Sequence, residues 1–201
     1  MSFAIAFVAG YLCGSMPFGY WLVRVTKHVD IRTVGSGNIG ATNVWRVFGR
    51  RYGLPVVVLD TLKGFAPALV ATLWVGHVAG VVAGGGAMLG HARPLFLRFE
   101  RGGKMVATAG GAFLGVAPLV GACAAGVWIV VFLLFRYASV ASIVAAASLP
   151  VSALLLGEPW AVIGLAIAAT AGVVWLHRAN IRRLRAGTET RAVLPSVRAR
   201  T

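Results

Sequence analysis

The sequence is poor in charged residues, and carboxylates are the scarcest of them. Only 12% of its 201 residues are charged, whereas a soluble domain of this size usually has ~25%. Five acidic residues stand against 19 lysines and arginines, which gives a formal net charge of +14. The hydrophobic share is 59%, and the mean hydropathy is +0.84. These values exclude an ordinary soluble domain and predict an integral membrane protein that binds anionic molecules or lipids, with no nucleic acid as partner.

Metal and disulfide chemistry lack the residues that they need. None of the acidic residues forms a D-x-x-D pair, which excludes the magnesium site of CDP-alcohol phosphotransferases and membrane prenyltransferases. The two cysteines, Cys13 and Cys123, lie in apolar runs outside any Cys/His cluster, so we expect free thiols. The His-x4-Asp pattern of another acyltransferase class is also absent. We therefore expect no metal ion and no cofactor.

No lysine or arginine precedes the first apolar run, 2–23, whereas Arg24, Lys27 and Arg32 follow it. A secretory signal peptide carries its positive charges before its apolar core. The inverted order here predicts an uncleaved helix with the N-terminus outside.

Long apolar runs are abundant. They cover residues 2–23, 53–75, 78–97, 105–135, 138–156 and 160–176. Each is roughly long enough to cross ~30 Å of hydrocarbon at ~1.5 Å per residue. The fourth run is either one over-long helix or two short helices broken around Pro118 and Gly121.

The distribution of positive charge decides between these two counts. If 105–135 crosses twice, one face collects the basic residues of 24–51, 93–104, 136 and 177–200, and the turns of the other face have no lysine or arginine. The positive-inside rule then predicts an all-α polytopic membrane protein of about seven transmembrane helices, with the N-terminus outside and the C-terminus cytoplasmic. We expect a single integral membrane domain, 1–201, whose basic tail at about 190–201 is mobile.

Three loops on the basic face contain the unusual polar residues. They read GSGNIGATNVWR at 35–46, RGGKMVAT at 101–108 and HRANIRRLRAGTE at 177–189. Glycine, hydroxyl and amide side chains beside cations at helix ends favour anion binding, because backbone N–H groups and helix N-termini attract negative charge. The loops therefore predict a site for a phosphorylated molecule.

The first loop matches two nucleotide-binding patterns that its context excludes. Gly35, Gly37 and Gly40 complete a G-x-G-x-x-G fingerprint, and Ala41 replaces the lysine of a P-loop. Both patterns require a preceding strand, whereas a membrane helix and a short basic loop precede this one. A tight turn would explain the glycines equally well, but their polar neighbours favour an anion site. These neighbours are Ser36, Asn38, Thr42, Asn43 and Arg46.

The other two loops add a lysine and a histidine–asparagine pair. Lys104 follows Gly102 and Gly103 at the start of a span. It is either a snorkelling interfacial lysine or a cation beside a helix N-terminus aimed at phosphate, and we favour the second. His177 and Asn180 are spaced i, i+3, which places them on one helix face for hydrogen bonding or proton handling.

Two polar pairs lie within or beside the spans. Asp60 and Lys63 are spaced i, i+3 in the second span, and we expect an internal ion pair in preference to substrate contact. Ser139 and Ser142 share a helix face near the basic end. They either bond carbonyls of their own helix or face the pocket.

Six motifs together carry a family resemblance. They are YLCGSMPFGYWLVR at 11–24, GSGNIGATNVWR, LDTLKGFAP at 59–67, GHARPLFLRF at 90–99, GGK-VAT at 102–108, and HRANIRRLRAGTE. In this order and over nearly the whole chain, they resemble the bacterial membrane-bound acyl-phosphate-dependent glycerol-3-phosphate acyltransferases. The resemblance implies acyl transfer from acyl phosphate to the 1-hydroxyl of glycerol 3-phosphate, the first step of phospholipid synthesis. It also implies a bacterial inner-membrane protein whose site faces the cytoplasm.

The resemblance also assigns roles to individual residues. It implies that the catalytic residues are Ser36, Arg46, Lys104, His177 and Asn180. Together with the polar residues above, the expected substrate-binding set is Gly37, Asn38, Gly40, Thr42, Asn43, Gly102, Gly103 and Ser142. The expected structural residues are Asp60, Lys63 and Glu189.

The second loop departs from the family pattern in two places. The sequence RFERGGKM has Glu100 and Arg101 where the family usually has one residue, and Met105 where it has glycine. Because methionine resists a positive φ, we expect a helix to begin immediately after Lys104.

The chemistry needs charge neutralisation more than a protein base. Two substrates with up to about four negative charges repel each other in a dry pocket, and we expect Arg46, Lys104 and the glycine-loop amides to offset this. No side chain is an obvious general base. We therefore expect the phosphoryl oxygens of acyl phosphate to accept the proton, with a lasting acyl-Ser36 intermediate as the less favoured alternative. An anion transporter and a catalytically degraded paralogue are the alternative functions.

Overall fold

The computed structural model describes residues 2–192, and no β-strand occurs among them. The helices are α1 (Ser2–Gly14), α2 (Phe18–Lys27), α3 (Ala41–Phe48), α4 (Arg50–Trp74), α5 (His77–Ala92), α6 (Val106–Val116), α7 (Pro118–Phe135), α8 (Ala138–Leu155), α9 (Trp160–Leu176) and α10 (Arg178–Arg185). Two short 3-10 segments, η1 (Ile31–Thr33) and η2 (Leu95–Leu97), lie in the loops. The predicted all-α class is confirmed.

The long apolar run 105–135 is two helices, because α6 ends at Val116 and α7 begins at Pro118. By length and composition alone, four candidate membrane spans occur within residues 2–192, or five if α9 and α10 form one bent span. Helices α5 and α6 have only 16 and 11 residues. At ~1.5 Å per residue they fall short of ~30 Å of hydrocarbon. The count of seven crossings and the orientation stay predictions.

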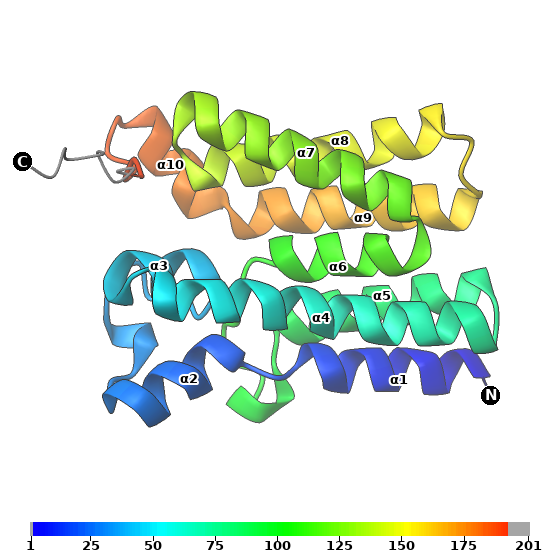
Figure 1. Ribbon diagram of the computed structural model, residues 1–201, viewed down its shortest axis with the longest axis horizontal. Coiled ribbons are helices and arrows are strands. Elements are labelled where there is room, and N and C mark those ends of the chain that lie inside the picture. Colours follow the sequence, from blue (N-terminus) through cyan, green and yellow to red (C-terminus); the bar gives the residue numbers. More distant parts are fainter. Residues whose placement is uncertain (1, 193–201) are drawn as a thin grey trace, which may run out of the picture.

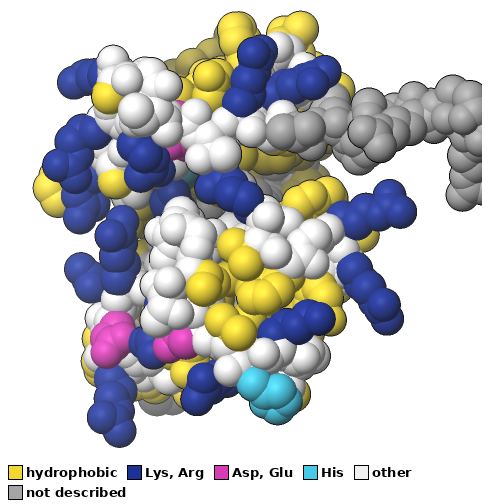
Figure 2. Space-filling model, turned by 90° about the vertical axis from the view of Figure 1, so that its left-hand side faces the viewer, with side chains coloured by type: hydrophobic (Ala, Val, Ile, Leu, Met, Phe, Trp, Pro, Cys, Tyr) yellow, Lys and Arg dark blue, Asp and Glu magenta, His cyan; other side chains and the backbone are white. Residues whose placement is uncertain are grey.

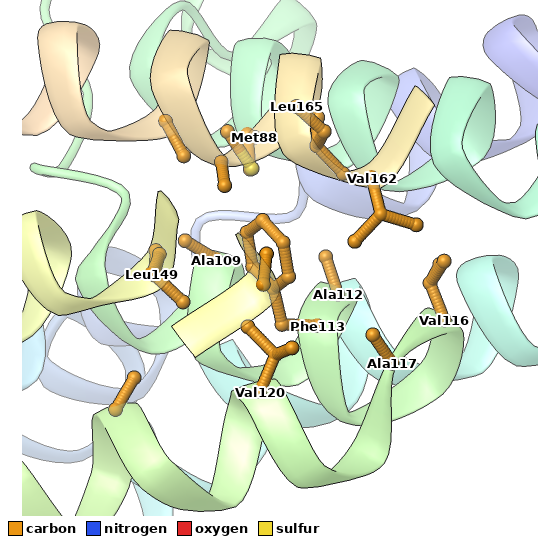
Figure 3. Close-up of a cluster of buried hydrophobic side chains, with 14 of the residues drawn as sticks. Met88, Ala109, Ala112, Phe113, Val116, Ala117, Val120, Leu149, Val162 and Leu165 are labelled. Atoms are coloured by element: carbon orange, nitrogen blue, oxygen red, sulfur yellow. The ribbon is translucent and has the colours of Figure 1, made fainter. Parts of the chain in front are cut away.

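The helices form two groups that share one core (Figure 1). Helices α1, α4, α5 and α6 pack together on one side, and α7, α8 and α9 on the other. The fully buried ring of Phe113, on α6, lies at the centre of the cluster between them (Figure 3). Val120, Leu149 and Leu165 contribute to this cluster from α7, α8 and α9. The short helix α6 therefore joins the two groups.

Helix α6 packs against α4 backbone to backbone. A Cβ atom on Gly111 would lie 1.9 Å from the Thr61 carbonyl oxygen, and one on Gly64 would lie 2.1 Å from the Thr108 carbonyl oxygen. Small residues that let helix backbones approach are the usual means of packing in membranes, where apolar burial adds little between helices. This contact fixes the position of α6 along α4. It thereby also fixes where the loop between α5 and α6 ends.

The basic residues gather at one end of the bundle. Figure 2 shows lysine and arginine side chains dominating the end that carries α3 and α10. The turns at the opposite end, 75–76, 117 and 156–159, have no lysine or arginine. Lys63 is the exception within a long helix, and it is buried in α4.

The first residues of the predicted mobile tail are attached to the bundle. Arg191 Nε donates to the Phe135 carbonyl at 3.2 Å, and the Ala192 amide donates to the Arg136 carbonyl at 2.8 Å. The remainder of that predicted tail, 193–201, lies outside the described residues.

We predict that Gly111→Ala destabilises the protein by about 1–3 kcal/mol, because its methyl group meets an α4 backbone that cannot yield. Thermal unfolding in detergent measures this. Gly110→Ala is the matched control, because a Cβ on the adjacent Gly110 meets nothing within 4 Å. Equal midpoints for the two variants would contradict the backbone contact.

Candidate functional site

The first loop, 35–46, is held together by Asn43. Its Oδ1 accepts from the Ser36 amide at 2.8 Å, and its Nδ2 donates to the carbonyls of Val34 at 3.1 Å and Asn38 at 2.9 Å. Because Asn43 is buried and its amide is used within the loop, it shapes the loop rather than presenting itself to a ligand. It was expected to bind substrate.

Two of the loop glycines are explained by their backbone. Gly35 and Gly37 have φ values of +61° and +68°, a left-handed conformation that favours glycine. Gly40 is the N-cap residue of α3, and its amide donates to Asn38 Oδ1 at 2.9 Å. The G-x-G-x-x-G spacing therefore reflects a folded turn and a helix start.

The second loop reaches the site along the end of α5. The amides of Gly102 and Gly103 donate to the carbonyls of Ala92 and His91, each at 3.0 Å. These amides were expected to bind phosphate, but they satisfy carbonyls left free at the helix C-terminus. Asn38 Nδ2 donates to the Gly102 carbonyl at 3.3 Å and ties the first loop to the second.

Met105 corrects one expectation. It takes φ +66° as the residue before α6, so the helix begins at Val106, one residue later than expected, and a methionine does adopt a left-handed conformation here. This conformation costs roughly 1–2 kcal/mol for a residue other than glycine. The buried Met105 side chain packs into the core and lies close to Gly172 of α9.

Glu100, one of the two residues that stand where the family usually has one, makes a contact of its own. Glu100 Oε2 pairs with Arg32 Nη1 at 2.5 Å. Arg32 also pairs with Asp30, Nη2 to Oδ2, at 2.7 Å. Arg32 lies just before the first loop, so Glu100 adds a second tie between the two loops.

Lys104 and Asn180 join the second loop to the third. Lys104 Nζ donates to Asn180 Oδ1 at 2.7 Å. The other end of the Asn180 amide, Nδ2, donates to Glu189 Oε1 at 2.6 Å. Glu189 also accepts from Ser139 Oγ at 2.8 Å and from Arg183 Nε at 2.6 Å. Glu189 therefore orients Asn180 so that its carbonyl oxygen faces the lysine.

A cavity of about 190 Å³ lies where the three loops meet. Its lining residues are Ser36, Gly37, Asn38, Arg101, Lys104, Ala179, Asn180 and Arg183. It is smaller than pockets for drug-sized ligands, which start near ~300 Å³, so it suits a small polar head. The lining comes from all three predicted loops, and the structure brings them together.

Positive charge dominates this cavity. Burial, and after it the charge of Arg183, lower the pKa of Lys104 to about 8, although Glu189 opposes them. Arg101 and Arg46 act in the same direction as Arg183. Although burial favours its neutral acid, hydrogen bonds from Asn180, Ser139 and Arg183 hold the pKa of Glu189 below its ordinary value. The carboxylate is thus charged at neutral pH and the lysine is mostly protonated.

Several predicted residues are not part of the cavity lining. Arg46 and Thr42 are exposed on α3. His177 is buried, and its Nδ1 lies 2.8 Å from the Val173 carbonyl, so Nδ1 carries the proton and Nε2 is left as an acceptor. Ser142 Oγ donates to the Ala138 carbonyl at 2.7 Å and accepts from Trp128 Nε1 at 3.1 Å.

Asp60 and Lys63 form a buried ion pair of 2.7 Å, away from the cavity lining. Among residues 2–192 no group of three His, Cys, Asp or Glu side chains could hold a metal ion.

The sequence reasoning missed two arginines of the cavity, Arg101 and Arg183. The signal for Arg183 was present, because it continues the i, i+3 series of His177 and Asn180 along α10. Arg101 had no such signal, since a loop residue has no helical period to place it.

Known proteins match this chain along almost its whole length. A sequence model described as glycerol-3-phosphate acyltransferase matches residues 4–187. Curated proteins of that name include one from Geotalea daltonii, 45% identical, with 92% of this chain and 95% of the relative covered. Another, from Desulforudis audaxviator, is 46% identical, with 94% and 96% covered.

Two solved structures have the same fold. The crystal structure of PlsY (YgiH), an integral membrane glycerol 3-phosphate acyltransferase, matches in its glycerol 3-phosphate form with a TM-score of 0.92 and 42% identity. Its lysophosphatidic acid form matches with a TM-score of 0.89 and 41% identity. Each match covers 96% of both chains.

We predict that Glu189→Ala lowers the stability of the α10 end by about 1.5–3 kcal/mol, the usual cost of losing hydrogen bonds to a charged group. Glu189→Gln should cost less, because its amide oxygen still accepts from Asn180. Thermal unfolding and hydrogen exchange of α10 measure both. Glu158→Gln, in the α8–α9 turn at the other end, is the control, and wild-type exchange in Glu189→Ala would disprove the role of Glu189.

Proposed function

The chain belongs to the glycerol-3-phosphate acyltransferase family and is an integral membrane acyltransferase, and we propose that its acyl donor is acyl phosphate. The acceptor is the 1-hydroxyl of glycerol 3-phosphate, and the products are 1-acyl-glycerol 3-phosphate and inorganic phosphate. The observation that carries the proposal is the cation-lined cavity where Lys104 meets Asn180. The glycerol 3-phosphate and lysophosphatidic acid forms of the related structure correspond to acceptor and product.

The cavity cations provide the binding of both substrates. Lys104 supplies a compact ammonium, and the guanidinium groups of Arg183 and Arg101 add charge from two sides. Arg46 adds a fourth positive charge from α3, near enough to influence the pKa of Lys104. Because the glycine-loop amides are already bonded to α5, these side chains supply most of the neutralisation that two phosphate groups require.

The reaction is a direct displacement at the acyl carbonyl. The 1-hydroxyl oxygen attacks the carbonyl carbon, the bond from that carbon to the phosphate oxygen breaks, and phosphate leaves. The hydroxyl proton ends on a phosphoryl oxygen of the departing phosphate, so no side chain has to act as base. Ser36, Asn180 and the unprotonated Nε2 of His177 hold the hydroxyl and the phosphate in line.

An acyl-Ser36 intermediate is the alternative route. It would require a base within reach of Ser36 Oγ, whereas the hydrogen bond that Ser36 makes to a side chain runs from its backbone amide to Asn43 Oδ1. Rapid quench with labelled acyl phosphate distinguishes the routes, because only the alternative leaves label on the protein.

We place the protein in the bacterial inner membrane with the cavity facing the cytoplasm. The support is the gathering of lysine and arginine at the cavity end (Figure 2) and their absence from the turns 75–76, 117 and 156–159 at the other end. Within residues 2–192, the turns at the opposite end have no lysine or arginine that a transported anion could meet, so the described part of the bundle provides no support for the transporter alternative.

We predict that Lys104→Ala and Arg46→Ala each lower kcat/KM by at least ~10²-fold, the usual cost of removing one group that stabilises transition-state charge. Phosphate release from palmitoyl phosphate, dependent on glycerol 3-phosphate, measures this. The control is Arg50→Ala, an exposed arginine at the start of α4, outside the cavity lining. Wild-type rates in Lys104→Ala or in Arg46→Ala would refute the assignment of that residue.

We predict that kcat/KM falls as the pH rises above about 8, because that is where burial and the neighbouring arginines place the pKa of Lys104. The lysine binds phosphate only in its charged form, which is lost above its pKa. In kcat the decline shifts to higher pH, because a bound phosphate raises the pKa of the lysine. Lys104→Arg should abolish the decline in whatever activity it keeps, since a guanidinium stays charged to about pH 12.

A further inference from the structure

A buried polar cluster lies directly behind the loop that presents Lys104. Its members are Asp60 and Lys63 of α4 and His91 at the end of α5, and all three are at most 5% exposed. The proposed reaction uses none of them. Buried ionisable groups are costly to keep, so their place against the active-site loop calls for a physical reason.

The imidazole ring of His91 lies against Gly103. A Cβ on Gly103 would lie 1.9 Å from His91 Nε2 and 2.5 Å from His91 Cε1, and all of its nearest neighbours belong to this one ring. Gly103 is not among the positive-φ residues, so its backbone does not demand glycine. The contact with the ring does.

The main chain of His91 is hydrogen-bonded to the same loop. Its carbonyl accepts from the Gly103 amide at 3.0 Å. The His91 ring and the His91 carbonyl therefore both contact Gly103, the residue that immediately precedes Lys104. A shift of His91 therefore moves the start of the lysine side chain.

The Asp60–Lys63 pair stands on the other side of the ring. His91 Nδ1 lies 3.8 Å from Asp60 Oδ1, and Lys63 Nζ lies 2.7 Å from the same oxygen. Lys63 also donates to the Met16 carbonyl at 2.8 Å, in the break between α1 and α2. The ring is thus enclosed between a neutralised carboxylate and the glycine loop.

Asp60 also holds the far end of the loop. Thr108 Oγ1, in the first turns of α6, donates to the Asp60 carbonyl at 3.0 Å. The α4 residue therefore contacts both helices that flank the loop, α5 through His91 and α6 through Thr108. Lys104 lies between these two anchors.

We propose that His91, backed by the Asp60–Lys63 pair, is a positioning residue that fixes Gly103 and thereby places the Lys104 ammonium in the cavity. This rests on the proposed function of Lys104. Without the ring the loop has room to sink toward α4, and the lysine leaves the position in which it meets Asn180 and the substrate phosphate.

A double-mutant cycle between His91 and Gly103 tests this directly, because it removes the ring and adds a methyl group in the same space. Gly103→Ala alone should lower kcat/KM by about 10²-fold, because its methyl group displaces the loop and small misplacements cost that much. His91→Ala should raise KM for glycerol 3-phosphate by roughly tenfold, as losses of supporting residues do. The double variant should be no worse than His91→Ala, because the absent ring makes room for the methyl group.

The alkaline decline of kcat/KM separates positioning from mere stability. In His91→Ala the loosened lysine gains water, so its pKa returns toward the ordinary value and the decline moves above pH 8. If Gly103→Ala lowers kcat/KM by the same factor in the wild type and in His91→Ala, the proposal is wrong. A lower melting temperature with unchanged KM and an unchanged alkaline decline overturns it as well.

Two further arms keep the test decisive. His91→Asn replaces His91→Ala in the cycle if the latter cannot be purified, and Gly110→Ala is the matched glycine control. The pH dependence of Lys104 acylation by an amine-reactive reagent, read by peptide mass spectrometry, reports the lysine without turnover. An inactive wild type whose Lys104 still shifts in His91→Ala would refute the proposed function and support the positioning role.

Discussion

The contact between Lys104 and Asn180 joins loops that come from opposite groups of helices. Lys104 belongs to the loop between α5 and α6, whereas Asn180 belongs to α10, which follows α9. The ammonium is partly buried among further cations, with Glu189 as the nearby carboxylate. Self-repulsion of this kind is tolerated because the helices hold the groups in place. A phosphate dianion would relieve that repulsion, which is the electrostatic reason for proposing that this cavity binds an anion.

Close packing of backbone against backbone positions Lys104, and it occurs in two places. In the bundle, Gly64 and Gly111 bring α4 and α6 together, which sets the position of the α6 N-terminus. At the site, Gly102 and Gly103 bring the loop against the end of α5, where its amides satisfy helix carbonyls. The glycine pair therefore serves the rigidity of the loop, and the lysine that follows it carries the charge.

The features predicted from the sequence are those that depend on local properties. Apolar run length and the distribution of charge predicted an all-α membrane protein, a break around Pro118 and Gly121, which the structure places at Ala117, and the gathering of three loops. Contacts between residues that are distant in the sequence could not be predicted from it. Asn43 turned out to be enclosed in its own loop, and the Gly102 and Gly103 amides bond to α5. Period and spacing place residues on a face, but they do not say which neighbour a donor will find.

The two departures from the family pattern show how the site tolerates change. Met105 adopts a left-handed conformation, and its side chain is buried in the core that α9 helps to form. Glu100, one of the two residues that stand where one is usual, precedes the anchored stretch and pairs with Arg32. Gly102 and Gly103 are bonded to α5 and Met105 is packed into the core, so the chain is anchored on both sides of Lys104. Anchoring on both sides of the lysine thus separates the chemistry of the site from variation in the loop that leads to it.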